Sequence, residues 1–193
     1  MTNNLTCIPK RYQRVTIPAL LEPLATRALV SLCRPGGWVT LSGPSGNGKT
    51  LLAAGLMQRL DAAQIRIERA AWLSAAEFAL EVWDARSCHS GQESATIRRY
   101  ATYDLLLLDD LGAEQEVDHA RQAIYILLNR RWEDCRRTIV TTNCSLGSIA
   151  KHLRAPIADR LIRAGEFIDV PGSSWALAHS LSQPPARGGA AEP

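Results

Sequence analysis

The octapeptide Gly43-Pro44-Ser45-Gly46-Asn47-Gly48-Lys49-Thr50 constrains the function of this chain more than any other segment. It fits the pattern G-x-x-x-x-G-K-S/T, in which a glycine-rich turn directs successive backbone N–H groups into a concave anion-binding loop. In that pattern Lys49 reaches the β- and γ-phosphates of a nucleotide, and the Thr50 hydroxyl sits on Mg²⁺. The residues expected to bind the nucleotide are Gly43, Pro44, Ser45, Gly46, Asn47, Gly48, Lys49, Thr50 and Leu51.

The residues on either side of this octapeptide strengthen the nucleotide interpretation. The segment Trp38–Leu41 before it reads as a short buried strand, and Leu52, Leu56 and Leu60 after it recur at helical spacing. A helix that begins at the loop points the positive end of its dipole at bound phosphates. The alternative is a chance glycine-rich turn, and the strand–loop–helix context argues against it. We therefore interpret the stretch as a phosphate-binding P-loop.

The size and composition of the chain restrict its class. A chain of 193 residues, 46% of them hydrophobic, can bury the core of one ordinary domain without disulfides. The five cysteines are scattered and form no C-x-x-C pair, so neither a zinc site nor a disulfide framework is indicated. Neither a signal peptide nor an apolar run of membrane-spanning length is visible, so we expect a cytoplasmic protein without a membrane partner.

The apolar pattern predicts strands that alternate with helices. Strands are expected at residues 38–41, 65–70, 104–110, 138–143 and 167–170. Helices are expected at about residues 19–33, directly after the P-loop, and at 74–86, where Ser74 and Glu77 form a capping box. A short helix is expected to end near residue 100, another helix is expected around 124–132, and two short helical segments are expected around Pro156. This alternation predicts an α/β fold, with a parallel sheet between two layers of helices. We divide the chain into a lead segment (1–36), a core (37–171) and a Pro-, Gly-, Ser- and Ala-rich tail (172–193) expected to be disordered.

Two carboxylates end the strand that is predicted at residues 104–110. Four consecutive leucines precede Asp109 and Asp110, and such an unbroken apolar run is typical of a parallel strand that is covered on both faces. Ligands of open α/β sheets bind at the C-terminal ends of the strands. Asp109 would hold Mg²⁺, directly or through water, and Asp110 would orient or deprotonate the attacking water. The alternative is a solvated pair in a turn before Gly112, which the upstream P-loop disfavours.

Two further polar residues are candidates for the site. Asn143 ends the strand at 138–143, where it could cap the next helix or contact the γ-phosphate and the attacking water. Arg160, within Asp159-Arg160-Leu161, could be an ordinary surface residue. In P-loop enzymes, however, an arginine from a neighbouring subunit can stabilise the charge that develops on the γ-phosphate. With the P-loop and the Asp-Asp strand present, we assign both residues to catalysis together with Lys49 and Asp110.

Basic residues are unevenly distributed along the chain. Nineteen of the 22 are arginines, and the formal net charge is +3. Residues 121–163 contain nine bases and three acids, whereas residues 104–118 contain six acids and no base. A solvated helix face and a nucleic-acid or subunit surface both agree with this pattern. Our candidate DNA contacts are Arg86, Arg98 and Arg99, which precede the Asp109–Asp110 strand.

Five segments, in this order, resemble the AAA+ ATPases of the DnaC helicase-loader and IstB transposition-helper group. The resemblance runs from about Ile8 to Trp175. It implies a sheet of order 5-1-4-3-2, a nucleotide at a subunit boundary, and Walker B, sensor-1 and arginine-finger roles for Asp109 with Asp110, Asn143 and Arg160. The five segments are Ile8-Pro9-Lys10-Arg11-Tyr12, the P-loop, Leu105–Gly112, Thr138–Asn143 and Ile157–Leu161.

The same resemblance implies ATP and Mg²⁺ as cofactors, single-stranded DNA as a ligand and assembly into homo-oligomers. We expect a slow ATPase that DNA or assembly stimulates and that loads a replicative helicase in DNA replication. A transposase helper is the first alternative. A nucleotide-gated binding module that hydrolyses little ATP is the second.

The sequence departs from the family pattern at both ends. Members of the family often have a sensor-2 arginine after the last strand, but here Gly172-Ser173-Ser174-Trp175 is followed by Ala176. We therefore expect an incomplete C-terminal lid and slow turnover. Only 36 residues precede Gly37, so a dedicated helicase-binding domain is expected to be absent or supplied elsewhere.

Overall fold

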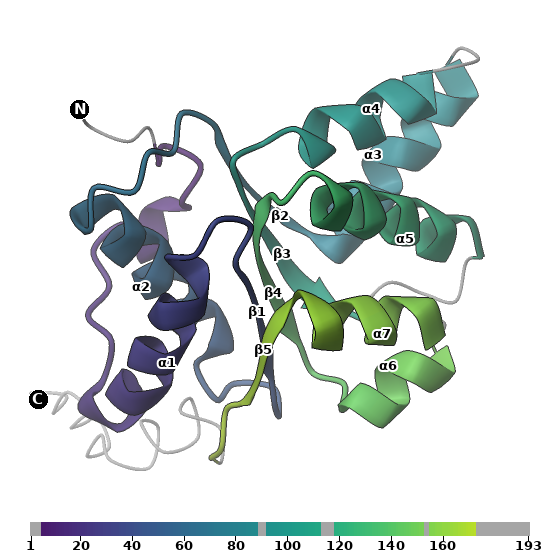
Figure 1. The fold of residues 1–193 in the computed structure, drawn as a ribbon. Coiled ribbons are helices and arrows are strands. Elements are labelled where there is room, and N and C mark those ends of the chain that lie inside the picture. The colour runs from purple at the N-terminus through teal and green to yellow at the C-terminus, as the bar shows by residue number, and fades with distance from the viewer. Residues whose placement is uncertain (1–4, 89–91, 113–117, 153–154, 173–193) are drawn as a thin grey trace, which may run out of the picture.

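The computed structural model describes residues 5–88, 92–112, 118–152 and 155–172. Five parallel strands form one sheet between two layers of helices (Figure 1). The strand order β2-β3-β4-β1-β5 is the predicted order 5-1-4-3-2 read from the other edge, so the predicted fold is confirmed. The strands are β1 (Trp38–Ser42), β2 (Ala70–Ser74), β3 (Leu105–Leu111), β4 (Arg137–Thr142) and β5 (Gly165–Asp169).

Alternate side chains of β3 supply two separate cores. Leu105 and Leu107 pack under the N-terminal layer, whereas Leu106 and Leu108 pack under the opposite layer. This burial on both faces explains why the strand is an unbroken apolar run. The N-terminal layer comprises η1 (Lys10–Tyr12), η2 (Ala19–Leu21), α1 (Glu22–Leu32) and α2 (Lys49–Ala62). The opposite layer comprises α3 (Ala75–Cys88), α4 (Gln92–Ala101), α5 (Asp118–Glu133), α6 (Leu146–His152) and α7 (Ala155–Ala164) (Figure 1).

The second strand begins later than the sequence predicted. The alternation of residues 65–70 predicted a strand, but β2 spans Ala70–Ser74. The N–H groups of Glu68 and Arg69 each donate to the Asp104 carboxylate at 3.0 Å, and the Asp104 N–H donates to the Arg69 carbonyl at 2.9 Å. These bonds tie the preceding segment to the start of β3, so the ladder between β2 and β3 begins only at Ala70.

The start of α3 has the capping box that the sequence predicted. The Ser74 N–H donates to Glu77 Oε2 at 2.9 Å, and the Glu77 N–H donates to Ser74 Oγ at 3.0 Å. The reciprocal bonds satisfy two N–H groups at the helix start. The helix continues to Cys88, past its predicted end at Arg86, and the helix expected up to about residue 100 is α4, which begins at Gln92.

A buried arginine holds α4 and α5 together against β4. Arg131 is 0% exposed, and its Nη1 donates at 2.8 Å to the carbonyl oxygens of both Tyr100 and Tyr103. Its Nε donates to Thr138 Oγ1 at 2.9 Å, and its Nη2 donates to the Arg137 carbonyl. Burial lowers the pKa of Arg131 to about 9. The cation is tolerated because neutral acceptors surround it, in the way that a buried charge requires.

The lead segment packs onto the core through the buried side chains of Ile8, Ile17 and Leu21. No helix of the described ranges combines the length and the apolar character that crossing a bilayer requires. The disorder expected for residues 172–193 and the missing sensor-2 arginine concern positions that, apart from Gly172, lie outside the described residues.

Candidate nucleotide-binding site

The P-loop connects the C-terminal end of β1 to the N-terminus of α2. Gly48 precedes the helix with a φ of 91°, in the left-handed region that side chains disfavour. A Cβ on Gly43 would lie 2.5 Å from Asn47 Nδ2 and 2.5 Å from the Val170 carbonyl oxygen. The glycines at these two positions are therefore required by backbone conformation and close packing. No side chain of the described residues caps α2 at Gly48, so the first N–H groups of this helix are available to an anion bound at the loop.

A pocket of about 350 Å³ lies in front of this loop. Five residues of the P-loop and the next residue, Leu51, line the pocket, and the ends of β3 and β4 contribute Asp110 and Asn143. The structure therefore brings the predicted phosphate-binding loop and two of the predicted catalytic residues to one place. Gly43, Pro44 and Asn47 are not among the residues that line the pocket. The lining residues are Arg11, Tyr12, Ser45, Gly46, Gly48, Lys49, Thr50, Leu51, Asp110 and Asn143.

The Lys49 ammonium is held against the loop. Its Nζ donates to the carbonyl oxygens of Gly43 at 2.9 Å and Pro44 at 2.7 Å, and to Asn47 Oδ1 at 3.1 Å. Asn47 is itself anchored, because its Nδ2 donates to the Val170 carbonyl at the end of β5. Lys49 is only 5% exposed, and desolvation lowers its pKa while nearby carboxylates oppose that shift. A poorly solvated cation at the pocket wall is well suited to a polyanionic ligand.

Asp109 lies directly behind Thr50. The Thr50 hydroxyl donates to Asp109 Oδ1 at 3.1 Å, and the Thr141 hydroxyl donates to the same oxygen at 2.5 Å. Asp109 is 8% exposed, and burial raises its pKa, which the hydrogen bond from Thr141 opposes. Hydroxyl and carboxylate oxygens are the ligands that Mg²⁺ prefers. The adjacent oxygens of Thr50 and Asp109 therefore fit the predicted Mg²⁺ site.

A β-bulge separates the directions of the two carboxylates. Two residues of β3, Asp109 and Asp110, stand opposite a single residue of β4, Thr141. Asp110 has a left-handed φ of 55°. The Asp110 N–H donates to Thr141 Oγ1 at 2.9 Å, and that hydroxyl in turn donates to Asp109. Aspartate is one of the few residues besides glycine that adopt this conformation readily. The bulge buries Asp109 and leaves Asp110 at the pocket wall.

The side chain of Asn143 is not the cap of the following helix. The Ser148 N–H at the start of α6 donates to Ser145 Oγ at 3.2 Å, and the Ile149 N–H donates to the Ser145 carbonyl at 2.9 Å. Ser145 is thus the capping residue. Asn143 is exposed and lines the pocket. The position of Asn143 agrees with the catalytic assignment, and its contact with the γ-phosphate and the attacking water stays a prediction.

Arg160 lies on α7 and is not among the residues that line the pocket. Its Nε donates to Asn129 Oδ1 of α5 at 2.9 Å, and its guanidinium carbon lies 4.3 Å from the centre of the Trp132 ring. This position agrees with a residue that cannot reach the nucleotide of its own chain. The arginine-finger role stays a prediction.

The three candidate DNA contacts lie on α3 and α4 and differ in their surroundings. Arg86 Nη1 is 2.9 Å from His119 Nδ1 at the start of α5. Arg99 is paired with Glu81 of α3. Arg98 is exposed. All three are outside the pocket, and their contact with DNA stays a prediction.

Two residues of the pocket were missed as functional candidates. Tyr12 stacks on Trp72 of β2 with ring centres 5.3 Å apart and planes 16° apart, and the Arg11 guanidinium carbon lies 4.8 Å from the Tyr12 ring centre. The Tyr12 carbonyl accepts a hydrogen bond from Gln58 Nε2 of α2 at 2.7 Å. The Ile8–Tyr12 segment was singled out only for its resemblance to the family. That resemblance was the one available signal. The P-loop begins more than 30 residues after this segment, and the residue pattern of the segment does not indicate that the two are in contact.

Solved structures of replication proteins share this fold. The DnaC helicase loader superposes with a TM-score of 0.71 at 20% identity, over 84% of this chain and 100% of that one. DnaI gives a TM-score of 0.67 at 22% identity, over 86% and 93%. The replication initiator DnaA bound to AMPPCP and single-stranded DNA gives 0.68 at 18% identity, over 86% of this chain and 51% of that one. At these identities the likeness establishes the fold.

A family model of IstB-like ATP binding proteins matches residues 16–183, which include the P-loop, both carboxylates, Asn143 and Arg160. A search of curated proteins finds no match. The family match confirms the predicted relation to IstB-type proteins, and the solved structures confirm the predicted fold. This chain belongs to the IstB-like ATP-binding protein family.

Proposed function

We propose that this chain hydrolyses ATP with Mg²⁺, assembles with copies of itself on single-stranded DNA, and loads a replicative helicase. The observation that carries the ATPase activity is the convergence of Lys49, Thr50, Asp110 and Asn143 on one pocket. Each of these residue types has a defined task in phosphoryl transfer. The structure of DnaA with AMPPCP and single-stranded DNA supports both the nucleotide and the DNA.

The proposed reaction divides these tasks among the walls of the pocket. Lys49 neutralises the β- and γ-phosphates from the loop side. Asp110 accepts a proton from the water that attacks the γ-phosphorus while the bond to the ADP oxygen breaks, and Asn143 orients that water. Thr50 and Asp109 would hold Mg²⁺, which supplies positive charge at the phosphates when bound.

The remaining wall suits the other end of the nucleotide. The P-loop occupies the phosphate end, so Arg11 and Tyr12 are left for the base and the sugar. The stack of Tyr12 on Trp72 fixes the ring, and a fixed aromatic ring loses little entropy when a ligand binds. We therefore assign the N-terminal segment to nucleotide recognition.

A nucleotide titration tests the ATP site. Lys49→Ala should lose most of its affinity for Mg²⁺-ATP, because the cation that neutralises the phosphates is gone. Lys151→Ala is the matched control, since Lys151 is an exposed lysine of α6 outside the pocket. Equal affinity of the wild type and Lys49→Ala would refute the site.

The choice of partner rests on two different observations. Coverage of the whole DnaC chain supports a helicase loader, whereas the match to IstB-like proteins supports the alternative, an ATPase helper of a transposase. Tagged full-length chain should be incubated with the replicative helicase, or with the transposase, of its own organism, with and without ATP. ATP-dependent recovery of the helicase supports the loader. Recovery of the transposase but not the helicase would contradict the loader role and support the role of transposase helper.

A further inference from the structure

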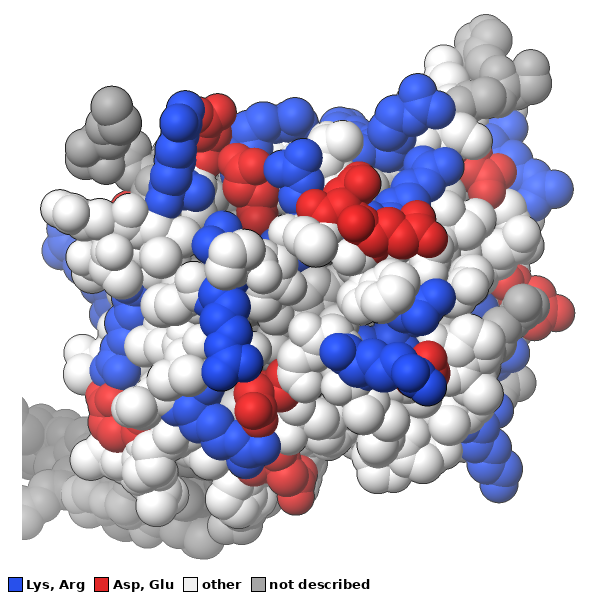
Figure 2. All heavy atoms as spheres, in the orientation of Figure 1, with Lys and Arg blue, Asp and Glu red and all other residues white. Residues whose placement is uncertain are grey.

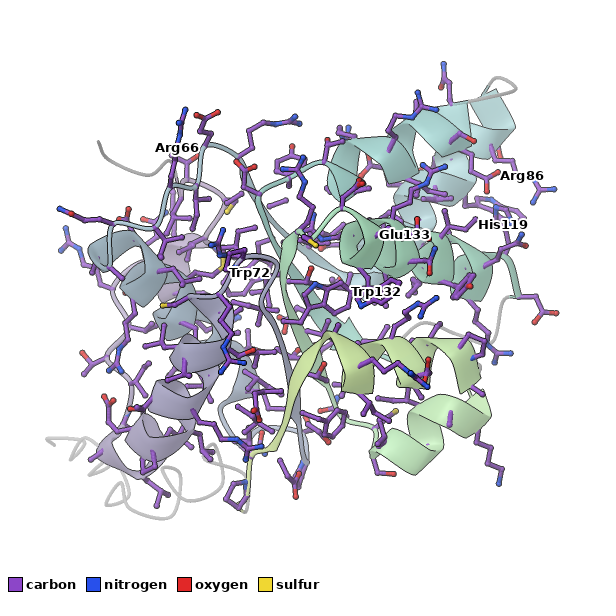
Figure 3. The ribbon with its side chains drawn as sticks, viewed as in Figure 1. Arg66, Trp72, Arg86, His119, Trp132 and Glu133 are labelled. Carbon is purple, nitrogen blue, oxygen red and sulfur yellow. The ribbon has the colours of Figure 1, made fainter. Side chains whose placement is uncertain are left out.

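Two side chains of α5 hold Arg160 at the junction of α5 and α7. Arg160 Nε donates to Asn129 Oδ1 at 2.9 Å, and the guanidinium carbon lies over the Trp132 ring, 4.3 Å from its centre. Asn129 Nδ2 donates to Glu133 Oε1 at 2.7 Å, which fixes the direction of the Asn129 amide. Figure 3 shows Trp132 and Glu133 near the C-terminal end of α5, with Trp132 between that helix and α7. The guanidinium is therefore held by the Trp132 ring and, through Nε, by Asn129.

Within the described part of the chain, the Arg160 guanidinium has no carboxylate closer than 4.0 Å. Its nearest acid among the described residues is Asp159, whose Oδ2 is 4.0 Å from Nη1. The other oxygen of Asp159 accepts a hydrogen bond from Arg163 Nε at 2.6 Å. Figure 2 shows a compact basic group over α7, the helix that carries Arg160 and Arg163. The bond to Asn129 uses Nε, and within the described ranges Nη1 has only the 4.0 Å ion pair with Asp159, so the Nη groups can still donate hydrogen bonds to an anionic ligand.

The surface around this contact is open to a partner. Trp132 is 39% exposed, and the side chain of Arg160 is 23% exposed. Ile162 of the same helix is also among the exposed large apolar residues. Contact of the apolar Trp132 ring with water is unfavourable, so a surface that only faces solvent gains nothing from an exposed tryptophan there.

We infer that Trp132 and Asn129 are positioning residues, which hold the Arg160 guanidinium ready for the γ-phosphate bound to a neighbouring copy of the chain. The inference rests on the proposed role of Arg160 at the nucleotide of another subunit. A free arginine loses conformational entropy when it is immobilised, whereas one that is already held loses less. A charge fixed before the reaction also stabilises the transition state better than one that must reorient.

The competing explanation is that the contact merely attaches α7 to α5. In that case its loss would lower stability and damage every function of the subunit, including ATP binding in the subunit's own pocket. A positioning role makes a different demand. Its loss should impair only the help that a subunit gives to its neighbour.

The first test compares single variants of the full-length chain. Trp132→Ala should lower kcat roughly 10- to 100-fold toward the value of Arg160→Ala, with unchanged ATP affinity in a titration. Trp132→Phe should keep part of the rate, because an aromatic face still attracts the cation. Combining Trp132→Ala with Arg160→Ala should cause no further loss, since both act through one group. Trp83→Ala, which removes another exposed tryptophan, should keep the wild-type rate without DNA.

The second test mixes inactive variants, so that each interface combines two kinds of subunit. Trp132→Ala mixed with Lys49→Ala should regain activity, because an intact Arg160 then meets an intact P-loop. Trp132→Ala mixed with Arg160→Ala should stay inactive. Wild-type turnover of Trp132→Ala, or failure of Lys49→Ala to rescue it, would overturn the positioning role even if Arg160→Ala and Lys49→Ala rescue each other. Wild-type turnover of Arg160→Ala would overturn the proposed role of Arg160 and this inference with it.

Discussion

The Thr50 hydroxyl and the Asp109 carboxylate, 59 residues apart in the sequence, lie 3.1 Å apart and join the P-loop to the central strand. A second hydroxyl, from Thr141, donates to the same oxygen. Two neutral donors only partly offset the burial that raises the pKa of Asp109. A divalent cation would stabilise this carboxylate much more strongly than they do. The ionised Asp109 carboxylate should therefore be more stable with Mg²⁺-nucleotide bound than without it.

This relationship predicts opposite effects of Asp109→Asn with and without ligand. Without nucleotide the variant should be at least as stable as the wild type at neutral pH, because it removes a buried charge and still accepts the two hydroxyl bonds. With Mg²⁺-ATP the wild type should gain stability through binding, and the variant should gain little. Thermal unfolding with and without Mg²⁺-ATP measures both effects. An equal upward shift of Tm in the two proteins would exclude Asp109 from the metal site.

Hydrolysis should depend on Asp110 more than binding does. Asp110→Asn removes the proton acceptor, yet asparagine also tolerates the left-handed φ of 55° at this bulge. The variant should bind ATP with near wild-type affinity, and its turnover should fall roughly 100-fold or more. Asp110→Ala is the comparison for backbone strain, since alanine disfavours this φ. If Asp110→Asn lost ATP binding, the residue would have a structural or metal-holding role instead.

The predictable part of this molecule rests on local signals. The P-loop glycines, the leucine run of β3 and the Ser74–Glu77 capping box each involve residues close in sequence, and each formed as predicted. The predicted start of β2 was wrong. The N–H groups of Glu68 and Arg69, which the pattern assigned to a strand, donate instead to the carboxylate of Asp104, more than 30 residues away. The stack of Tyr12 on Trp72 likewise depends on how the chain folds back, so no pattern within either segment reveals it.

Arg131 shows the same limit for the core. A charged residue at helical spacing is ordinarily assigned to the solvated face, but this one is buried and bonded to backbone carbonyls at the end of α4. Arg131→Lys should lower the free energy of unfolding by about 3 kcal/mol or more, since lysine has fewer donors and leaves buried carbonyls unpaired. Urea denaturation measures the change. Arg130→Lys, at the half-buried neighbouring position, should cost little, and an equally small loss for Arg131→Lys would contradict the role of the buried network.

Tyr100 gives the fold a dependence on alkaline pH. Burial raises its pKa from the ordinary value of 10.0 to about 12, and its hydroxyl donates to Glu81 Oε2 at 2.7 Å. The native state thus keeps a proton that the unfolded state releases near pH 10. This contribution to stability is fully present below pH 10 and is lost as the pH rises toward 12. Denaturation at pH 8 to 11.5 should show the decline, and Tyr100→Phe should lack this part of it. The same decline in both proteins would assign it to other groups.

The structure makes the DNA prediction sharper by separating Arg98 from Arg99. Arg99 is paired with Glu81 and lies over the Tyr100 ring at 4.5 Å, so much of its charge is already engaged within the protein. Arg98 is exposed on the same helix. If α4 contacts phosphates, Arg98→Ala should weaken binding of single-stranded DNA more than Arg99→Ala. It should also reduce the slope of log affinity against log salt concentration by about 1. Titrations at several salt concentrations, with ATP present, measure both quantities. If neither variant changed the slope, Arg98 and Arg99 would be ordinary solvated residues of α4, and DNA would have to bind elsewhere on the protein.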